Sequence, residues 1–343
     1  MMETMLGLFK DLSVFDPDVI PNQLLFREKE IEELVRLFAP LQFGFKPASN
    51  AVIYGQPSVG KTSVARKILK LFKEEVASKV ATCYVNLAVK RTSAEVAAEI
   101  YFQVTEHLSR RRVSKCLEAT FKTLKNNEKN LLIVFDDFNA FSGGDINTLL
   151  QTLLRPAESR FQGVHVRVIL VSSGDDYFLR NRVRSSLEPI EFQFKDYNDD
   201  QKFEILKKRC IQGFSRFVIS EKLIRDVAER ATDLRHALAI LYYVGGIANK
   251  KITKRDIDTA FTMVKGMPKK NESHLSELET FLLSKIKEST TISTGELHRY
   301  HQKEKGDITI QGIGKSLKKL KTLGIVDYKF VSIRGRTRVW FKT

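Results

Sequence analysis

Eight residues near the start of the chain have the types and spacing needed to hold a phosphate group. Residues 55–62 read G-Q-P-S-V-G-K-T and match the pattern G-x-x-x-x-G-K-[ST]. Gly55 and Gly60 permit the backbone angles of a tight loop, and N–H groups at a helix start attract an anion. Lys61 would reach the β- and γ-phosphates, and Thr62 would ligate Mg²⁺. The predicted cofactors are ATP or ADP with Mg²⁺, held by Gly55, Gln56, Pro57, Ser58, Val59, Gly60, Lys61, Thr62 and Ser63.

The flanking residues give this loop the setting that the motif requires. Residues 51–54 form a short apolar run, which predicts a buried strand. Residues 63–72 place apolar side chains at helical spacing. The order strand, loop, helix distinguishes a phosphate-binding loop from a chance glycine turn.

Acidic side chains follow a second apolar run. Residues 131–135 predict a buried strand, and Asp136 and Asp137 come directly after it. An acid at this Walker B position holds Mg²⁺, and a second acid could activate the attacking water. Lys61, Asp136 and Asp137 are therefore candidate catalytic residues. The alternative is that the two acids lie on a surface turn.

Further candidate site residues lie later in the chain. Ser173 follows the apolar run 164–171 and could contact the γ-phosphate, although a serine there can also simply cap a turn. Arg182 could act as an arginine finger in a neighbouring subunit's site, or it could be solvated or face DNA. Arg235 lies at a predicted helix start and could reach back to the γ-phosphate.

The charge of the chain points to an anionic partner. The 343 residues carry a formal net charge of +16. The last 39 residues contain ten Lys or Arg and two acids, so half of the net charge lies there. A second cluster comprises Arg110, Arg111, Arg112 and Lys115. Local concentration favours nucleic acid over an anionic membrane surface or a uniformly basic, solvated surface.

The remaining composition narrows the class of protein. No stretch approaches the ~20 apolar residues that span a bilayer, and the first residues lack the form of a signal peptide. Three widely separated cysteines fit a reduced compartment better than a disulfide framework. We therefore expect a cytoplasmic, nucleoid-associated protein without a membrane partner.

The order of predicted elements divides the chain into three parts. Strands alternate with helices in residues 1–194, which predicts a parallel α/β sheet. Residues 195–267 read as helices, and residues 266–273 (G-M-P-K-K-N-E-S) have the chemistry of a linker. Residues 274–343 read as three helices and a β-hairpin, which is the pattern of a winged helix-turn-helix.

These motifs together resemble the archaeal origin-recognition and cell-division-control initiator family, within the initiator clade of the AAA+ ATPases. The resemblance covers nearly the whole chain. It rests on L-F-R-E-K-E-I (25–31), N-A-V-I-Y-G (50–55), Y-V-N (84–86), I-L-V-S-S (169–173), R-V-R-S-S-L (182–187) and T-D-L-R-H-A-L (232–238). It implies a P-loop AAA+ core with a parallel sheet and helices on both faces, a helical lid and a C-terminal winged helix.

The chain departs from the family pattern at several positions. The family usually has Asp-Glu where this chain has Asp136-Asp137, and Asn where this chain has Ser173. Thr232 replaces a usual glycine, and the loop interior lacks an extra glycine. The resemblance thus implies ATP binding with slow hydrolysis, as in a divergent paralogue.

The resemblance also implies two DNA-contacting surfaces. Helix 309–323 would enter the major groove, with Ile310, Ile313, Leu317 and Leu320 packed inward. Its polar residues would be Gln311, Lys315, Ser316, Lys318 and Lys319. The wing would present Arg334, Gly335 and Arg336. A helical insertion at about residues 107–125 would add Arg110, Arg111, Arg112 and Lys115.

We therefore predict an ATP-regulated, sequence-specific double-stranded DNA binder that marks a replication origin and is at most a weak ATPase. Its further partners would be paralogous initiator subunits and the replicative helicase. One alternative is a transcriptional regulator that uses nucleotide only as a structural ligand. Others are a clamp-loader-like ATPase, against which the winged helix argues, and a signal-transduction ATPase, which lacks the arginine that Arg235 supplies.

Overall fold

The chain folds as two compact units, Met1–Val264 and Lys265–Thr343. The computed structural model describes residues 8–45, 49–108, 112–141, 146–155, 161–173, 187–265, 276–289, 291–322, 325–332 and 336–342.

A five-stranded parallel sheet with the order β2-β3-β4-β1-β5 forms the centre of the first unit. Its strands are β1 (Asn50–Gly55), β2 (Val80–Asn86), β3 (Asn130–Asp136), β4 (Val166–Val171) and β5 (Pro189–Phe194). Every residue of β3 and β4 is buried, as expected for central strands covered on both faces. The carboxyl ends of these strands therefore meet at one edge, where ligands bind in such sheets.

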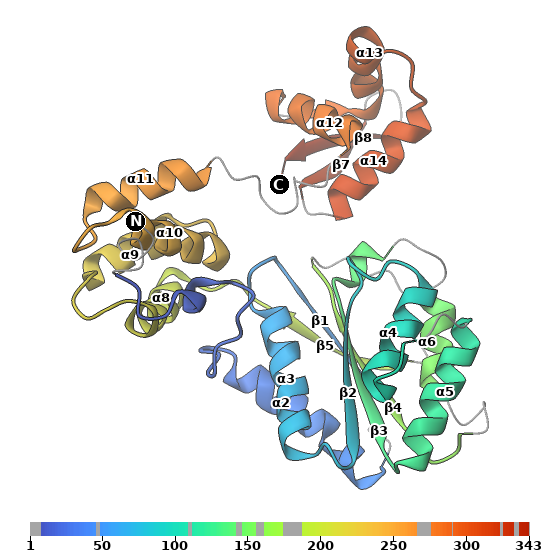
Figure 1. Cartoon of the computed structure of the whole chain (residues 1–343). Helices are drawn as coiled ribbons and strands as arrows, with labels where there is room; N and C mark the ends of the chain where they lie inside the picture. Colours follow the sequence, from blue (N-terminus) through green and yellow to red (C-terminus); the bar gives the residue numbers. More distant parts are fainter. Residues whose placement is uncertain are drawn as a thin grey trace. The chain divides into compact units, whose positions relative to one another are not determined.

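Helices cover both faces of the sheet (Figure 1). One face carries α2 (Glu28–Phe38) and α3 (Lys61–Glu75), and the other carries α4 (Ser93–Thr105), α5 (Val113–Asn126) and α6 (Ile146–Leu154). Buried apolar side chains form a separate cluster on each face. Short 3-10 turns lie at η1 (Leu12–Phe15), η2 (Ala39–Phe43) and η3 (Phe138–Ala140).

A helical lid completes the first unit. It consists of α8 (Asp199–Gly213), α9 (Glu221–Arg230), α10 (Leu234–Ile247) and α11 (Lys254–Lys265), which share one apolar cluster. Leu8 and Phe15 from the start of the chain belong to the same cluster. The N-terminal segment therefore packs on the lid, and α2, which follows it in the chain, packs on the sheet.

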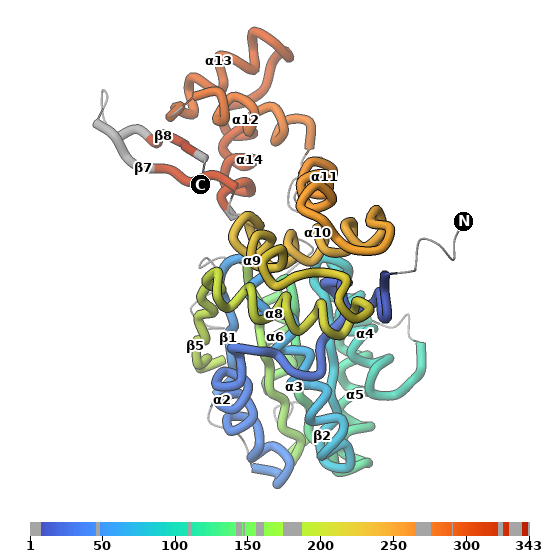
Figure 2. Tube along the Cα trace, turned by 90° about the vertical axis from the view of Figure 1, so that its left-hand side faces the viewer, coloured from blue at the N-terminus to red at the C-terminus, as the bar shows by residue number. Residues whose placement is uncertain are grey.

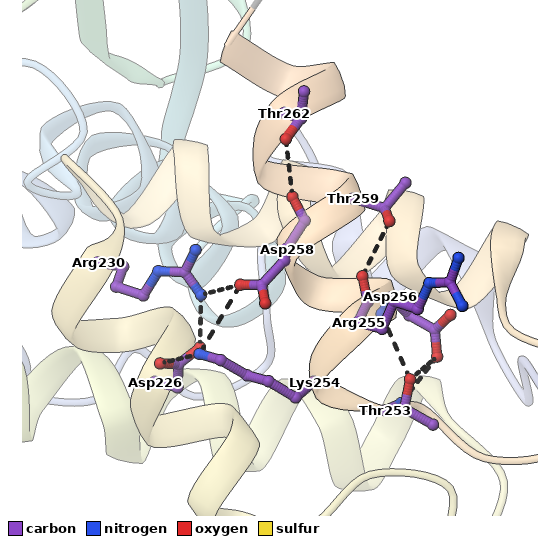
Figure 3. A network of polar contacts seen from close by, with 9 residues as sticks. All are labelled: Asp226, Arg230, Thr253, Lys254, Arg255, Asp256, Asp258, Thr259 and Thr262. Carbon is purple, nitrogen blue, oxygen red and sulfur yellow. Dashed lines mark hydrogen bonds and ion pairs between the residues drawn. The ribbon is translucent and has the colours of Figure 1, made fainter.

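Ion pairs join α9 to α11 in the lid (Figure 3). The Arg230 guanidinium donates to Asp226 and Asp258, each at 2.8 Å, and lies over the Phe261 ring at 4.1 Å from its centroid. The Lys254 ammonium donates to Asp226 at 2.6 Å. These contacts fix the two helices that flank α10.

The described residues of the second unit form helices and a small sheet (Figure 2). The elements are α12 (Glu277–Glu288), β6 (Ile292–Ser293), α13 (Thr294–Lys305), α14 (Ile310–Thr322), β7 (Val326–Ser332) and β8 (Arg336–Lys342). The sheet has the order β6-β8-β7 with antiparallel pairing. Ile313, Leu317 and Trp340 are buried together in its core. This arrangement is consistent with a winged helix.

Some expected packing differs from the structure. Ile310 was expected to pack inward, but it is 55% exposed because it stands at the first turn of α14, before the buried face begins. Strand β5 was not predicted from the sequence. It is an edge strand, and most of its residues are exposed or half-buried, so it has no continuous apolar run. The linker 266–273 lies outside the described residues. Among the residues with a described placement, no helix is long and apolar enough to cross a bilayer.

Candidate functional site

The phosphate-binding loop lies between β1 and α3, at the carboxyl edge of the sheet. Gly55, Ser58 and Gly60 have positive φ angles of 144°, 68° and 89°. A Cβ on Gly55 would lie 2.3 Å from the Phe194 carbonyl oxygen, and a Cβ on Gly60 would lie 2.9 Å from the Tyr197 hydroxyl. The backbone angle therefore favours glycine at both positions, and at Gly55 the nearby backbone carbonyl also leaves no space for a Cβ.

Lys61 is buried inside this loop. Its ammonium donates to the carbonyls of Gly55 and Gln56, at 2.8 and 2.6 Å, and its residue exposure is 6%. Burial lowers the pKa of Lys61 to about 8, although the carboxylates of Asp136 and Asp137 favour its charged form. An anionic ligand would supply the negative charge that the buried ammonium lacks.

Asp136 ends β3 and faces the loop. Its carboxylate accepts hydrogen bonds from Thr62 Oγ1 at 3.2 Å, from the Tyr84 hydroxyl at 2.6 Å and from its neighbour's N–H at 2.9 Å. Burial raises the pKa of Asp136, and the Tyr84 hydrogen bond opposes this shift. The two residues predicted to hold Mg²⁺, Thr62 and Asp136, therefore lie within hydrogen-bond distance of each other.

Asp137 is held beside Asp136 by a different strand. Asn86 at the end of β2 donates to Asp137 Oδ2 at 3.0 Å. Asp137 has a left-handed backbone with φ of 52°, a conformation that costs a non-glycine residue about 1 kcal/mol. Its carboxylate is thus fixed at the edge of the sheet, next to the candidate metal ligand.

The end of β4 carries a small polar network. The Ser172 hydroxyl donates to Asn139 Oδ1 at 2.8 Å, and Asn139 Nδ2 donates to the Ser173 carbonyl at 2.6 Å. The predicted contact residue, Ser173, thus engages the network through its backbone, whereas Ser172 is 1% exposed and engages it through its side chain. The Asn139 side-chain amide therefore lies beside Ser173, the residue that was expected to contact the γ-phosphate.

The predicted arginines differ in their placement. Arg235 lies exposed in the first turn of α10 and is close enough to Lys61 for its charge to oppose the protonation of that lysine. The lid therefore directs one cation towards the phosphate-binding loop. Arg182 lies outside the described residues.

The geometry fits a nucleoside triphosphate with Mg²⁺. The loop supplies backbone N–H groups at the start of α3 and a buried ammonium, and the sheet edge supplies a hydroxyl and a carboxylate as oxygen ligands. When bound, the metal would neutralise phosphate charge. Lys61 and Arg235 would bind the phosphates, and Asp137 would accept a hydrogen bond from an attacking water.

The candidate DNA-contacting residues also differ in their surroundings. Gln311, Lys315 and Lys318 are exposed at i, i+4 and i+7 on α14, opposite the buried face, and Ser316 is half-buried. Lys319 instead forms an ion pair at 2.9 Å with the buried carboxylate of Glu279. Its ammonium is therefore engaged within the unit.

The remaining DNA candidates fall in two places. Arg112 and Lys115 are exposed at the start of α5, where Lys115 pairs with Glu118 at 2.9 Å. Arg336 begins β8. Arg110, Arg111, Arg334 and Gly335 lie outside the described residues.

Several residues of the site carried no chemical signal of their own in the sequence. Tyr84 appeared only within the Y-V-N resemblance, and Asn86 and Asn139 lie on separate segments that the fold brings to one edge. Arg27 appeared only within L-F-R-E-K-E-I, yet it donates to the Val59 carbonyl of the loop at 3.1 Å. Only the position after a parallel strand, which Asn86 shares with Asp136, could have indicated any of them.

Comparison with known proteins finds relatives that match nearly the whole chain. Residues 23–169 match a family model described as an AAA ATPase domain. The chain is 32% identical to ORC1-type DNA replication protein 2 of Methanosarcina mazei, over 97% of this chain and 92% of that protein. It is 26% identical to the Methanothermobacter thermautotrophicus protein of the same name, over 97% and 91%.

Solved structures show the same fold. The Aeropyrum pernix ORC1 protein in complex with DNA matches with a TM-score of 0.73 and 25% identity, covering 98% of this chain and 94% of that one. The Aeropyrum pernix ORC2 protein, solved with ADPNP and ADP, matches with a TM-score of 0.72 and 21% identity, over 98% and 94%. The fold is thus an AAA+ fold, and the chain belongs to the family of ORC1-type DNA replication proteins.

Proposed function

We propose that this protein binds ATP and double-stranded origin DNA and helps to start DNA replication. The observation that carries the proposal is the combination, in one chain, of a phosphate-binding loop with a paired Thr62–Asp136 site and a second unit that exposes a basic helix face. Its relatives are named as DNA replication proteins, which supports a role in replication initiation.

The division of labour would follow the predicted domains. Residues 1–194 would form the nucleotide-binding domain, residues 195–267 the lid, and residues 274–343 the DNA-binding domain. ATP would set the pose of the lid, because Arg235 lies close to the loop lysine. The structure of a relative with DNA supports a DNA partner. Paralogous initiator subunits and the replicative helicase would be further partners at the nucleoid.

Hydrolysis would be slow. Asp137 has a shorter side chain than the glutamate usual in the family, and Asn86 occupies one of its carboxylate oxygens. Ser173 contributes a carbonyl to the polar network at the end of β4. ATP would therefore act mainly as a bound switch, with cleavage to ADP and phosphate as a rare event.

Footprinting on chromosomal origin DNA tests the proposal. We expect protection of a defined site in the presence of ATP, at protein concentrations that leave random DNA unprotected. Equal protection of origin and random DNA contradicts it. Occupancy of promoters that survives loss of Lys61 would instead favour a transcriptional regulator, and a stable ring bound to a sliding clamp would favour a loader.

A further inference from the structure

The guanidinium of Arg27 joins three segments of the nucleotide-binding unit. Arg27 precedes α2 and is 6% exposed. Its Nε donates to the Val59 carbonyl at 3.1 Å, and one Nη donates to the Lys195 carbonyl at 2.7 Å. Lys195 lies in the hinge segment, residues 195–198, which leads from β5 to the lid helix α8. A single side chain thus links the phosphate-binding loop to the hinge of the lid.

The surroundings hold this guanidinium in place. Its second Nη donates to Glu30 at 3.1 Å and to the Phe26 carbonyl at 3.2 Å, and Phe26 has a left-handed backbone with φ of 63°. The guanidinium also lies over the rings of Tyr197 and Phe194, at 4.3 and 4.9 Å from their centroids. A strained backbone that persists at such a point is typical of a functional site.

The contact with Val59 fixes a neighbouring donor. In a planar trans peptide, the C=O and the following N–H point in opposite directions. Because Arg27 holds the Val59 carbonyl, the Gly60 N–H is directed away from Arg27. Gly60 immediately precedes α3, and its own carbonyl accepts the Val64 N–H at 2.9 Å. Each of the two peptide groups that flank the Gly60 Cα therefore has its carbonyl held by a hydrogen bond.

Residues of the hinge segment also lie close to Gly60 and Lys61. The Tyr197 hydroxyl is the nearest atom to a Cβ built on Gly60, at 2.9 Å, and the charge of Asp196 is felt by Lys61. The Tyr197 ring also lies beneath the Arg27 guanidinium, whose central carbon is 4.3 Å from the ring centroid. A change in the conformation of the phosphate-binding loop when phosphate binds would therefore alter the contacts of the hinge segment, which leads to the lid.

We propose that Arg27 is a positioning residue for the phosphate-binding loop: it directs the Gly60 N–H at the bound phosphates and couples that orientation to the lid hinge. The inference rests on nucleotide binding in the proposed function but is independent of which DNA is recognised. Lysine cannot replace Arg27, because one ammonium cannot reach the Val59 and Lys195 carbonyls and also stack on the rings.

The test compares Arg27→Lys with the control Arg36→Lys in the full chain without DNA. Arg36 lies on α2, the helix that Arg27 precedes, and is exposed. Among described residues it pairs only with the exposed Glu32. We expect Arg27→Lys to weaken ADP and ATP binding about tenfold by calorimetry, and to reduce the shift of the Gly60 amide resonance on ADP binding. Arg36→Lys should match the wild type in both measurements.

A second variant covers the case in which Arg27→Lys fails to fold. Tyr197→Leu removes the ring on which the Arg27 guanidinium lies, and we expect about fivefold weaker ADP binding from the lost cation–π contact. Unchanged ADP affinity in Tyr197→Leu, or in a folded Arg27→Lys with only a lower melting temperature, overturns the proposal. A wild-type chain that binds neither ADP nor ATP overturns the nucleotide site itself, and with it this role for Arg27.

Discussion

At the scale of single residues, the site depends on a lysine whose burial opposes its own charge. The pKa of Lys61 is lowered to about 8 by burial, so near pH 8 about half of the nucleotide-free molecules lack the proton. A bound polyphosphate favours the ammonium and raises this pKa. Nucleotide phosphates are already deprotonated at this pH. Most of the protons taken up when nucleotide binds should therefore go to Lys61.

We therefore predict that ADP binding near pH 8 takes up about half a proton. The measurement is calorimetry without Mg²⁺ in buffers of different ionisation enthalpy. The sign follows from the direction of the shift: affinity should fall as pH rises above 8, because the free protein then pays to recover the charge. Proton release, or an affinity that is constant from pH 7 to 9, would show that Lys61 does not contact the phosphates.

Asp137 offers a second test at this scale. Asp137→Glu lengthens the side chain that Asn86 now holds, so the carboxylate can reach further towards an attacking water. We predict a severalfold faster single turnover of ATP in Asp137→Glu and a slower one in Asp137→Asn, with ATP affinity unchanged in both. A rate in Asp137→Glu equal to that of the wild type would mean that side-chain length does not limit the chemistry.

At the scale of elements, the lid is held by contacts that can be removed singly. Arg230→Ala breaks one ion pair within α9, to Asp226, and one from α9 to Asp258 of α11 (Figure 3). It also removes the contact with the Phe261 ring. We predict a loss of about 1 kcal/mol in the free energy of unfolding, smaller at high salt. The control is Arg255→Ala on the exposed side of α11. Equal melting temperatures for the two variants would show that the network adds nothing.

Helix α14 contains a matched pair of lysines with different expected roles. Lys315 is exposed, whereas Lys319 pairs with the buried carboxylate of Glu279. We predict that Lys315→Ala weakens duplex binding and reduces the salt slope by about 0.9 if one phosphate contact is lost. Lys319→Ala should instead lower the melting temperature, because Glu279 is left without its cation.

Titrations of duplex by each variant, with thermal melts in parallel, check this separation. The pKa of Glu279 is lowered in the fold, chiefly by Lys319 acting against burial. The stability from this pair is therefore present at neutral pH and is lost as the pH falls through that lowered pKa. Reversed roles for the two lysines would mean that the DNA-facing surface of α14 has been misassigned.

At the scale of the whole molecule, the periodic elements could be predicted and the polar networks could not. Strand β1 covers the apolar run at residues 51–54, and β3 ends at Asp136 as expected for a buried run followed by acids. Strand β5 was not predicted because it has no continuous apolar run: it lies at the edge of the sheet, and only Phe194 among its residues is buried. Local pattern thus identifies strongly periodic elements only.

The site shows the same division. Lys61, Thr62 and Asp136 follow from motif and strand position, because parallel strands bring their carboxyl ends to one edge. Arg27, Asn139 and Tyr84 act through contacts between segments that are distant in sequence. From the sequence, Lys319 could not be distinguished from the neighbouring lysines of its helix. In the structure it pairs with the buried carboxylate of Glu279. Such pairings depend on tertiary structure and leave no local pattern.

The coupling of nucleotide to duplex is tested most directly by affinity for origin and shuffled fragments over a salt series, with ATP, with ADP and without nucleotide. We predict that the ATP-bound chain binds origin DNA at least about a thousandfold more tightly than shuffled DNA at physiological salt. We also predict that the ratio of the affinity for origin DNA to that for shuffled DNA is smaller without nucleotide. Equal affinity for both fragments, or a ratio that nucleotide does not change, would contradict the account.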